Sequence, residues 1–278
     1  MELCIPSGVR NVLRSRRVLR IVNWVVAILL SGSLELDAEE LKPGGTLELK
    51  FPQLAHDRRD ELSRCEVALP KSYRRDMQYP LVVWLEGGDG ASVPQTAFLP
   101  AGEFVAVGLP FPKGASQLTT PHLVGDFPAI WKYHRAMLEE MHRRIPNLDR
   151  RRSILAGFSN GAHAIDGMLK LKPDGSPSAS IASYFGIFIL IEGGGWDVTE
   201  GEYPDCTGKF AYLAFGERSS LARVVPHAAK SFVTHGASTH LSMMTGTRHE
   251  FAEFEKGYVK KWVEEVALPG VGTEAPKR

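Results

Sequence analysis

The sequence predicts an α/β fold with a mostly parallel central sheet that carries helices on both faces. From Leu81 onward, short apolar runs alternate with segments of helical periodicity, which is the pattern of strands joined by crossover helices. The run 81–85 is apolar at every position and is closely followed by glycines, as is typical of a strand buried on both faces. Because ligands bind at the carboxyl ends of parallel strands, we expect the functional site at that edge of the sheet.

Length and composition fit one globular domain. The chain has 278 residues, of which 44% are hydrophobic and 23% charged, and α/β domains of roughly 250 residues are common. We expect a signal peptide at 1–38, a single domain at 39–268 and a flexible tail at 269–278. Lysine and arginine (33) nearly balance aspartate and glutamate (32), giving a formal charge of +1, so the composition favours no nucleic-acid partner.

The first segment has the features of an export signal. Five arginines precede the apolar run 21–30, and the small residues near Ser33 and Ala38 suit cleavage. The run is shorter than the roughly 20 apolar residues of a membrane-spanning helix, so no stable membrane insertion is expected after cleavage. A secreted or periplasmic location follows, by the general export route or, given Arg16 and Arg17, by the twin-arginine route.

Two of the three cysteines would remain after cleavage. Cys4 leaves with the leader, whereas Cys65 and Cys206 stay in an oxidising compartment. The sequence leaves open whether these two form a disulfide or remain separate thiols.

Two strands are expected before the central parallel sheet. The segment 46–51 alternates polar and apolar residues, and 65–69 is a second short strand that ends at Pro70. These strands should pair antiparallel at one edge. The apolar runs 81–85 and 104–109 are then the first buried strands.

The remaining elements alternate between helix and strand. Apolar spacing predicts a helix over 127–145, within which His134 is interpreted as a buried or groove histidine rather than a metal ligand. After it we expect a strand from 154 to the serine at 159, strands at 184–191 and 210–215, a helix at 221–235 with Pro226, a strand at 241–245 and a helix at 251–266.

The strongest chemical signal is a serine between two glycines at the end of an apolar run. Gly157, Ser159 and Gly161 fit the G-x-S-x-G pattern, in which a sharp strand-to-helix turn presents a nucleophilic hydroxyl. A side chain at either glycine would collide with the neighbouring strand or helix. The pattern alone also fits an ordinary glycine-rich loop, so its surroundings must decide.

Those surroundings resemble the α/β-hydrolase superfamily, specifically its secreted esterase and depolymerase-like branch. The resemblance covers 67–266 and is carried by Leu69-Pro70 with Tyr73, by 79–85 before Gly87-Gly88, by the serine turn, and by Arg248-His249-Glu250-Phe251. It implies the α/β-hydrolase fold, hydrolysis of a carboxylic ester through an acyl-enzyme on Ser159, and no cofactor.

The order of the motifs makes His249 the expected general base. A serine hydroxyl needs an imidazole that takes its proton and later protonates the leaving group. His249 follows the last expected strand, where the superfamily order of nucleophile, acid and histidine places the base. His163 is the competing candidate, but on the helix after Ser159 it would point away from the exposed side of the serine.

The developing oxyanion needs backbone donors. The resemblance implies one from Asn160, directly after the nucleophile, and others from Gly87 and Gly88 in the loop after 81–85. Glu86 stands where the H-G-G-G pattern of esterases has histidine, which puts the usual anchoring of this loop in doubt. A phosphate-binding loop is disfavoured because no Gly-Lys-Ser/Thr follows.

The resemblance is weakest at the acid, which is the third member of the catalytic triad of nucleophile, acid and histidine. Relatives commonly carry an aspartate shortly after the strand that ends here at 215–216, but this sequence has Glu217. We expect Glu217 to orient the imidazole, with Asp197 in the preceding loop as the alternative. Metal chemistry is not implied. His249-Glu250 begins like the zinc-binding pattern H-E-x-x-H, but the second histidine of the pattern is replaced by Glu253.

The sequence therefore predicts an exported serine hydrolase that acts on an ester, and the resemblance together with the leader suggests an ester carried by a polymer. Trp84, Trp131 and Trp196 are candidate groove residues, although packing explains the first two better. The alternative is a catalytically impaired hydrolase fold that serves as a binding or surface protein, suggested by the missing aspartate and by Glu86.

Overall fold

The computed structural model describes residues 41–118, 120–171, 180–196 and 201–272. The expected leader at 1–38, Asp197 and the last six residues of the expected tail lie outside these ranges. Within them, no helix is long and apolar enough to cross a membrane.

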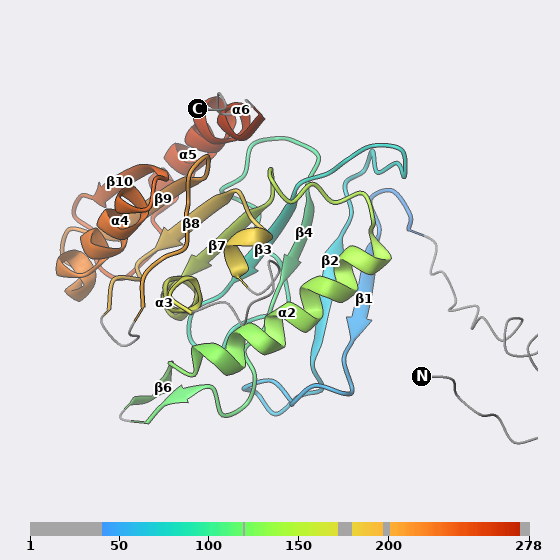
Figure 1. The fold of residues 1–278 in the computed structure, drawn as a ribbon, viewed down its shortest axis with the longest axis horizontal. Coiled ribbons are helices and arrows are strands. Elements are labelled where there is room, and N and C mark those ends of the chain that lie inside the picture. Colours follow the sequence, from blue (N-terminus) through green and yellow to red (C-terminus); the bar gives the residue numbers. More distant parts are fainter. Residues whose placement is uncertain (1–40, 119, 172–179, 197–200, 273–278) are drawn as a thin grey trace, which may run out of the picture. The chain divides into compact units, whose positions relative to one another are not determined.

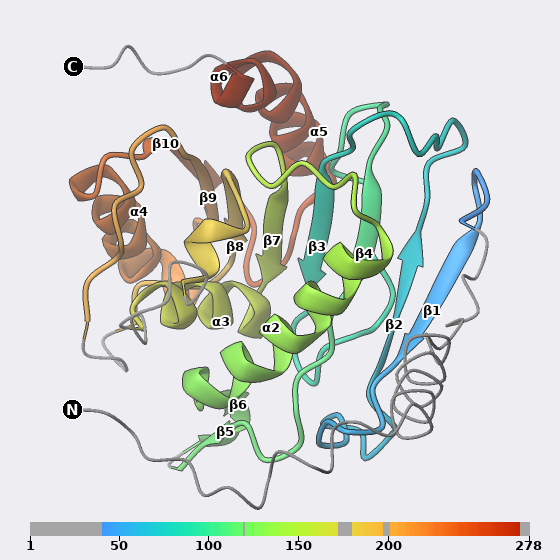
Figure 2. The same ribbon diagram turned by 45° about the vertical axis from the view of Figure 1, so that its right-hand side comes forward.

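A mixed sheet of eight strands forms the centre of the described chain (Figures 1 and 2). Its spatial order is β1-β2-β4-β3-β7-β8-β9-β10. The antiparallel pairs β1–β2 and β2–β4 lie at one edge, and all later pairs are parallel. The strands span Thr46–Lys50 (β1), Arg64–Ala68 (β2), Leu81–Leu85 (β3), Val105–Gly108 (β4), Ile154–Phe158 (β7), Ile187–Ile191 (β8), Phe210–Gly216 (β9) and Ser238–Met244 (β10). The predicted mostly parallel sheet with an antiparallel edge is confirmed.

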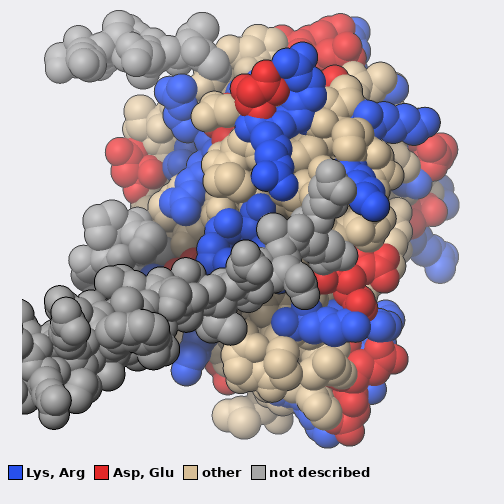
Figure 3. Space-filling model, turned by 90° about the vertical axis from the view of Figure 1, so that its right-hand side faces the viewer, with Lys and Arg blue, Asp and Glu red and all other residues tan. Residues whose placement is uncertain are grey.

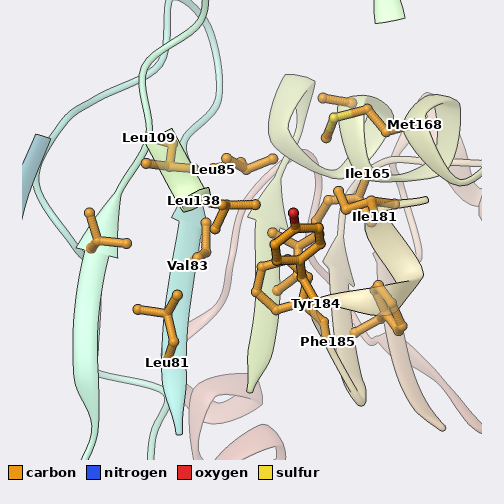
Figure 4. Packing of buried hydrophobic residues seen from close by; sticks show 14 of the residues in the cluster. Leu81, Val83, Leu85, Leu109, Leu138, Ile165, Met168, Ile181, Tyr184 and Phe185 are labelled. Carbon is orange, nitrogen blue, oxygen red and sulfur yellow. The ribbon is translucent and has the colours of Figure 1, made fainter. Parts of the chain in front are cut away.

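Helices cover both faces because the buried strands are apolar on both. In β3, Leu81, Val83 and Leu85 face the core under helices α2 (Phe127–Arg144) and α3 (Asn160–Leu169), and Figure 4 shows them against Leu109 and Leu138. Val82 and Trp84 alternate to the opposite core. Burial on both faces is therefore the reason that this run contains no polar residue.

The opposite core lies under the last helices of the chain. Helix α5 (Glu253–Trp262) continues through a π-helical turn (Val263–Ala267) into α6 (Leu268–Gly272). Val271 is buried there, and a Cβ on Gly270 would overlap the ring of Phe210. The tail predicted from Pro269 is thus helical as far as Gly272, because its apolar residues complete this core.

Other parts of the fold also differ from the prediction. The strand expected from Tyr184 begins at Ile187, because the chain first makes a 3₁₀ turn at Ile181–Ser183. The helix expected from Leu221 starts as a 3₁₀ turn (Ser220–Arg223) and becomes α4 at Val225–Thr234, with its proline in the first turn. A small hairpin, β5 (Ser116–Gln117) and β6 (Thr120–Val124), was not predicted.

The two cysteines of the described chain and its surface charges were also considered in the sequence prediction. Cys65 and Cys206 are both free and buried, and burial raises the pKa of their thiols to about 12 and about 11. On the face shown in Figure 3, basic and acidic side chains both occur, as the balanced composition leads one to expect.

Helix α2 holds a histidine whose protonation should couple stability to pH. His134 is buried, and its Nε2 donates to the carbonyl oxygen of Pro110 at 2.8 Å. Burial lowers the pKa of His134 to about 4. Below the unfolded-state pKa of about 6.5, the unfolded chain binds a proton that the folded one excludes. The free energy of unfolding should therefore fall between pH 6.5 and 4, by about 1.4 kcal/mol per pH unit from this group.

His134→Gln should make that pH dependence shallower by the same amount, since the amide can still donate to Pro110. Urea unfolding at several pH values between 7.5 and 4.5 measures it, and the value at pH 7.5 gives the cost of the substitution itself. An unchanged slope in the variant would contradict the assignment.

Candidate active site

The serine turn joins β7 to α3 at the carboxyl edge of the sheet (Figure 2). Ser159 has φ 53° and ψ −116°, a left-handed backbone conformation that is rare for a residue with a side chain. Its N–H donates to the carbonyl oxygen of Ile191 at 2.9 Å, and its side chain is partly accessible. The expected sharp turn with a presented hydroxyl is present.

Both glycines of the turn are required by space. A Cβ on Gly157 would lie 2.6 Å from the carbonyl carbon of Gly161, and a Cβ on Gly161 would overlap the carbonyl oxygen of Leu85. These neighbours are backbone atoms, so they cannot rotate away. The predicted steric role of the two glycines is confirmed.

Gly161→Ala should therefore destabilise the fold by about 3 kcal/mol or more, beyond ordinary core overpacking. Gly257→Ala is the matched control: it also lies in a helix, but a Cβ there meets nothing within 4 Å. The control should be neutral or gain about 0.5–1 kcal/mol. Denaturant midpoints of both variants measure the difference, and equal stabilities would contradict the steric explanation.

His249 lies beside the serine, as predicted. Its Nε2 is 2.8 Å from Ser159 Oγ, and its Nδ1 is 3.1 Å from Glu192 Oε2. A carboxylate only accepts, so Nδ1–H donates to Glu192 and leaves Nε2 to accept from the serine hydroxyl. The imidazole is 47% exposed while the side chain of Glu192 is fully buried, so one end of this hydrogen-bonded chain is accessible and the other is shielded.

Glu192 was not predicted as the partner of the histidine. It directly follows β8 and has φ 54°. Besides His249, its carboxylate accepts hydrogen bonds from the backbone N–H of Gly216 and, at 2.6 Å, from Ser219 Oγ. These three donors fix the carboxylate in position.

The expectation that Glu217 orients the imidazole is corrected by this geometry. Glu217 Oε2 accepts from the N–H of Gly246 at 2.7 Å, on the loop after β10. The register explains why Glu192 takes the place: Phe158 of β7 lies opposite Ile191 of β8, so the next residues on the two strands, Ser159 and Glu192, meet at the same edge.

The competing histidine has a different role. His163 Nδ1 accepts from the N–H of Gly194 at 2.9 Å, and its ring stacks on Trp196 with centroids 4.4 Å apart. Burial, followed by the nearby charge of His249, lowers the pKa of His163 to about 4. His163 is thus a neutral acceptor that packs the 192–196 loop onto α3.

The glycine loop after β3 is anchored by Glu86. Its Oε2 accepts from Trp84 Nε1 at 3.0 Å, and its Oε1 accepts from the N–H of Gly87 at 2.9 Å. Both carboxylate oxygens are therefore occupied, and the residue that replaces the usual histidine does hold the loop. The N–H of Gly87, expected as an oxyanion donor, is already bonded.

Two other backbone N–H groups lie beside the serine, those of Gly88 and Asn160. Within the described chain, no protein acceptor takes the N–H of Gly88 or of Asn160. Asn160 Nδ2 donates to the carbonyl oxygen of Gly88 at 2.9 Å, which ties the loop to the first turn of α3. A Cβ on Gly88 would meet no atom within 4 Å, so space is open on this side.

The far end of the loop is held by two arginines. Arg58 Nε lies 3.3 Å from Asp89 Oδ1, and Arg59 Nη2 donates to the carbonyl oxygen of Gly90 at 2.6 Å. Arg58 also donates to the carbonyl oxygen of Pro121 on β6. Fixed at both ends, the loop has the rigidity that a preorganised oxyanion site needs.

No group of three or more His, Cys, Asp or Glu side chains that could hold a metal ion is found among the described residues.

Comparison with known proteins gives the fold. No protein-family model matches the chain, and no curated protein sequence does. Solved structures do match. The carboxylesterase of Bacillus cereus has a TM-score of 0.55 at 13% identity over 84% of this chain and 98% of its own. A ferulic acid esterase of Anaeromyces mucronatus, in complex with ferulic acid, has a TM-score of 0.57 at 12% identity over 84% and 94%.

A third match is esterase 2 of Thermogutta terrifontis, phosphorylated by paraoxon, with a TM-score of 0.54 at 13% identity over 85% of this chain and 98% of its own. These similarities, together with the strand order, show that the chain has the α/β-hydrolase fold.

Proposed function

We propose that the protein is a serine carboxylic ester hydrolase that acts through an acyl-enzyme on Ser159. The observation that carries this proposal is the continuous hydrogen-bonded chain from Ser159 Oγ through His249 to the buried carboxylate of Glu192. In this role Ser159 is the nucleophile, His249 the general base and acid, and Glu192 the acid that orients the imidazole.

The geometry supports a complete reaction. Ser159 Oγ attacks the ester carbonyl carbon while His249 Nε2 takes its proton, and the N–H groups of Gly88 and Asn160 bind the oxyanion. His249 then gives the proton to the leaving alcohol as the C–O bond breaks. Water, activated by the same nitrogen, hydrolyses the acyl-enzyme, which releases the acid and restores the serine.

Three observations support this function over a catalytically impaired fold. Glu192 supplies the carboxylate that the sequence appeared to lack, and Glu86 supplies the anchor of the glycine loop. Among the structural neighbours, several are carboxylesterases or esterases, and one of them was phosphorylated by paraoxon. Export to the periplasm or the medium, and an ester on a polymer as substrate, are part of the proposal on the strength of the leader-like segment and the resemblance alone.

The proposal is tested with the mature protein, an organophosphonate probe and a short-chain chromogenic ester. We expect a single covalent adduct, assigned to Ser159 by peptide mass spectrometry, and loss of ester turnover in proportion to the adduct. Ser159→Ala should form no adduct. Absence of both adduct and turnover in the folded parent protein would overturn the proposal and favour the binding-protein alternative.

A further inference from the structure

An aromatic pocket of about 220 Å³ lies beside the proposed catalytic residues. Its apolar walls are Trp84, Ala97, Phe98, Phe158 and Phe251. Three of the rings form one cluster, with centroid distances of 5.3 Å for Trp84–Phe98, 5.9 Å for Phe98–Phe251 and 6.4 Å for Trp84–Phe251.

The pocket is built by the same segments that carry the catalytic groups. Phe158 precedes Ser159, Phe251 follows His249 by two residues, and Glu86 precedes the glycine loop. The segments pack closely, because a Cβ on Gly87 would lie 3.1 Å from both Phe158 Cδ1 and Ser159 Cβ. A group in this pocket is therefore close enough to be part of an ester bound at Ser159.

The pocket lies on the histidine side of the serine. The ring of Phe158 packs against that of His249 with centroids 5.2 Å apart, and Phe251 belongs to the same loop as His249. Since the imidazole delivers its proton to the departing oxygen, the part of the ester nearest to it is the alcohol. The pocket thus takes the leaving group and not the acyl chain.

The lining selects a neutral ring. The polar side chains of the wall are Glu86, Lys256 and the uncharged, exposed Gln95. Glu86 accepts from Trp84 Nε1 and from the N–H of Gly87, and Lys256 Nζ lies 2.7 Å from Glu253 Oε2. One anionic and one cationic side chain give no net charge to hold an ionised group. The volume also suits one ring, since a cavity of roughly 150 Å³ lined by apolar side chains binds benzene.

From these contacts we propose that the site is specific for esters of aromatic alcohols, with the ring of the leaving alcohol in the pocket of Trp84, Phe98, Phe158 and Phe251. This inference rests on the proposed function and names the substrate class of the same site. Offset and edge contacts with the four rings add to the burial of apolar surface.

The test compares benzyl acetate, ethyl acetate and ethyl benzoate. The benzyl ester places a ring on the alcohol, and the benzoate places it on the acyl group. We expect the ratio of kcat/KM for benzyl over ethyl acetate to fall roughly tenfold in Ala97→Phe, because the new ring fills the pocket that binds the alcohol. Comparing this ratio between variants cancels the intrinsic reactivity of the two esters. Ala97 is exposed, so the substitution should not disturb folding.

Phe254→Ala is the matched control, because Phe254 is an exposed ring on α5 outside the pocket lining. It should keep the parent ratio. If Ala97→Phe also keeps that ratio while ethyl acetate is still hydrolysed, or if it affects ethyl benzoate instead, the leaving-group assignment is overturned and the proposed function stands. If no acetate is hydrolysed and no phosphonate adduct forms, both fail.

Discussion

Glu192→Gln is expected to lower kcat for a simple ester by roughly 10³- to 10⁴-fold, as loss of the acid does in serine proteases with a Ser-His-Asp triad. Glutamine has nearly the same shape, but it carries no charge to stabilise the imidazolium. It can also turn its NH₂ toward Nδ1 of His249, which favours the wrong tautomer. The rate of phosphonate labelling at Ser159 should fall with kcat, because both reactions need the same proton transfer.

Glu217→Gln is the matched control for this substitution. Glu217 follows β9, and its carboxylate accepts from the N–H of Gly246 on the loop after β10, so turnover should stay within a few fold of the parent. Thermal unfolding of both variants separates lost chemistry from lost folding, since Glu192 also accepts from Gly216 and Ser219. Strong loss of turnover in Glu217→Gln with little effect in Glu192→Gln would restore the assignment made from the sequence.

The fold could be predicted because its signals are local. The strands at 81–85 and 154–158 are apolar on both faces, and each is followed within a few residues by glycines. Ser159 was recognised from the residues next to it, and His249 from its place after the last strand. The structure brings these two side chains together at 2.8 Å.

The carboxylate beside His249 could not be predicted in the same way, because its place depends on strand register. The sequence places Glu192 at the end of one strand and Glu217 after the next, and both positions lie at the same edge of a parallel sheet. Only the pairing of Phe158 with Ile191 brings the first of them next to the serine. A signal was nevertheless present: an acidic residue follows an otherwise apolar strand, directly before three glycines. The first of them lets the loop pack against Ser159 and α3, and the third lets it pack against the start of α4.

The hairpin at 116–124 was missed for a related reason. Its strands are short and partly exposed, so they lack the periodic apolar pattern on which the other elements were predicted. Its contribution to the site is through the backbone, since Asn160 Nδ2 donates to the carbonyl oxygen of His122. A backbone contact of this kind does not require a particular side chain, so the residue types of the hairpin do not indicate it.

Glu86 anchors the glycine loop after β3 through its carboxylate. Its two carboxylate oxygens receive the N–H groups of Trp84 and Gly87, so it fixes the start of the loop that carries the Gly88 donor. Glutamine offers one oxygen and would turn its NH₂ toward a second donor, which breaks one of these bonds. Glu86→Gln should therefore displace the loop and lower kcat by roughly 10²-fold, the cost of a displacement of about 1 Å in a catalytic group.

The role of Glu86 is to position the donor, so the measurement must separate this from binding in the aromatic pocket. Ethyl acetate has no ring to place there, and with this ester we expect the loss in kcat and little change in KM. Glu103→Gln, at an exposed carboxylate that accepts from Ser72, is the control and should leave both constants unchanged. A rise in KM with an unchanged kcat would mean that Glu86 serves the pocket and not the oxyanion. Glu86→Asp, which keeps both acceptor oxygens but shortens the reach, should recover part of the lost kcat if the anchoring bonds are the cause.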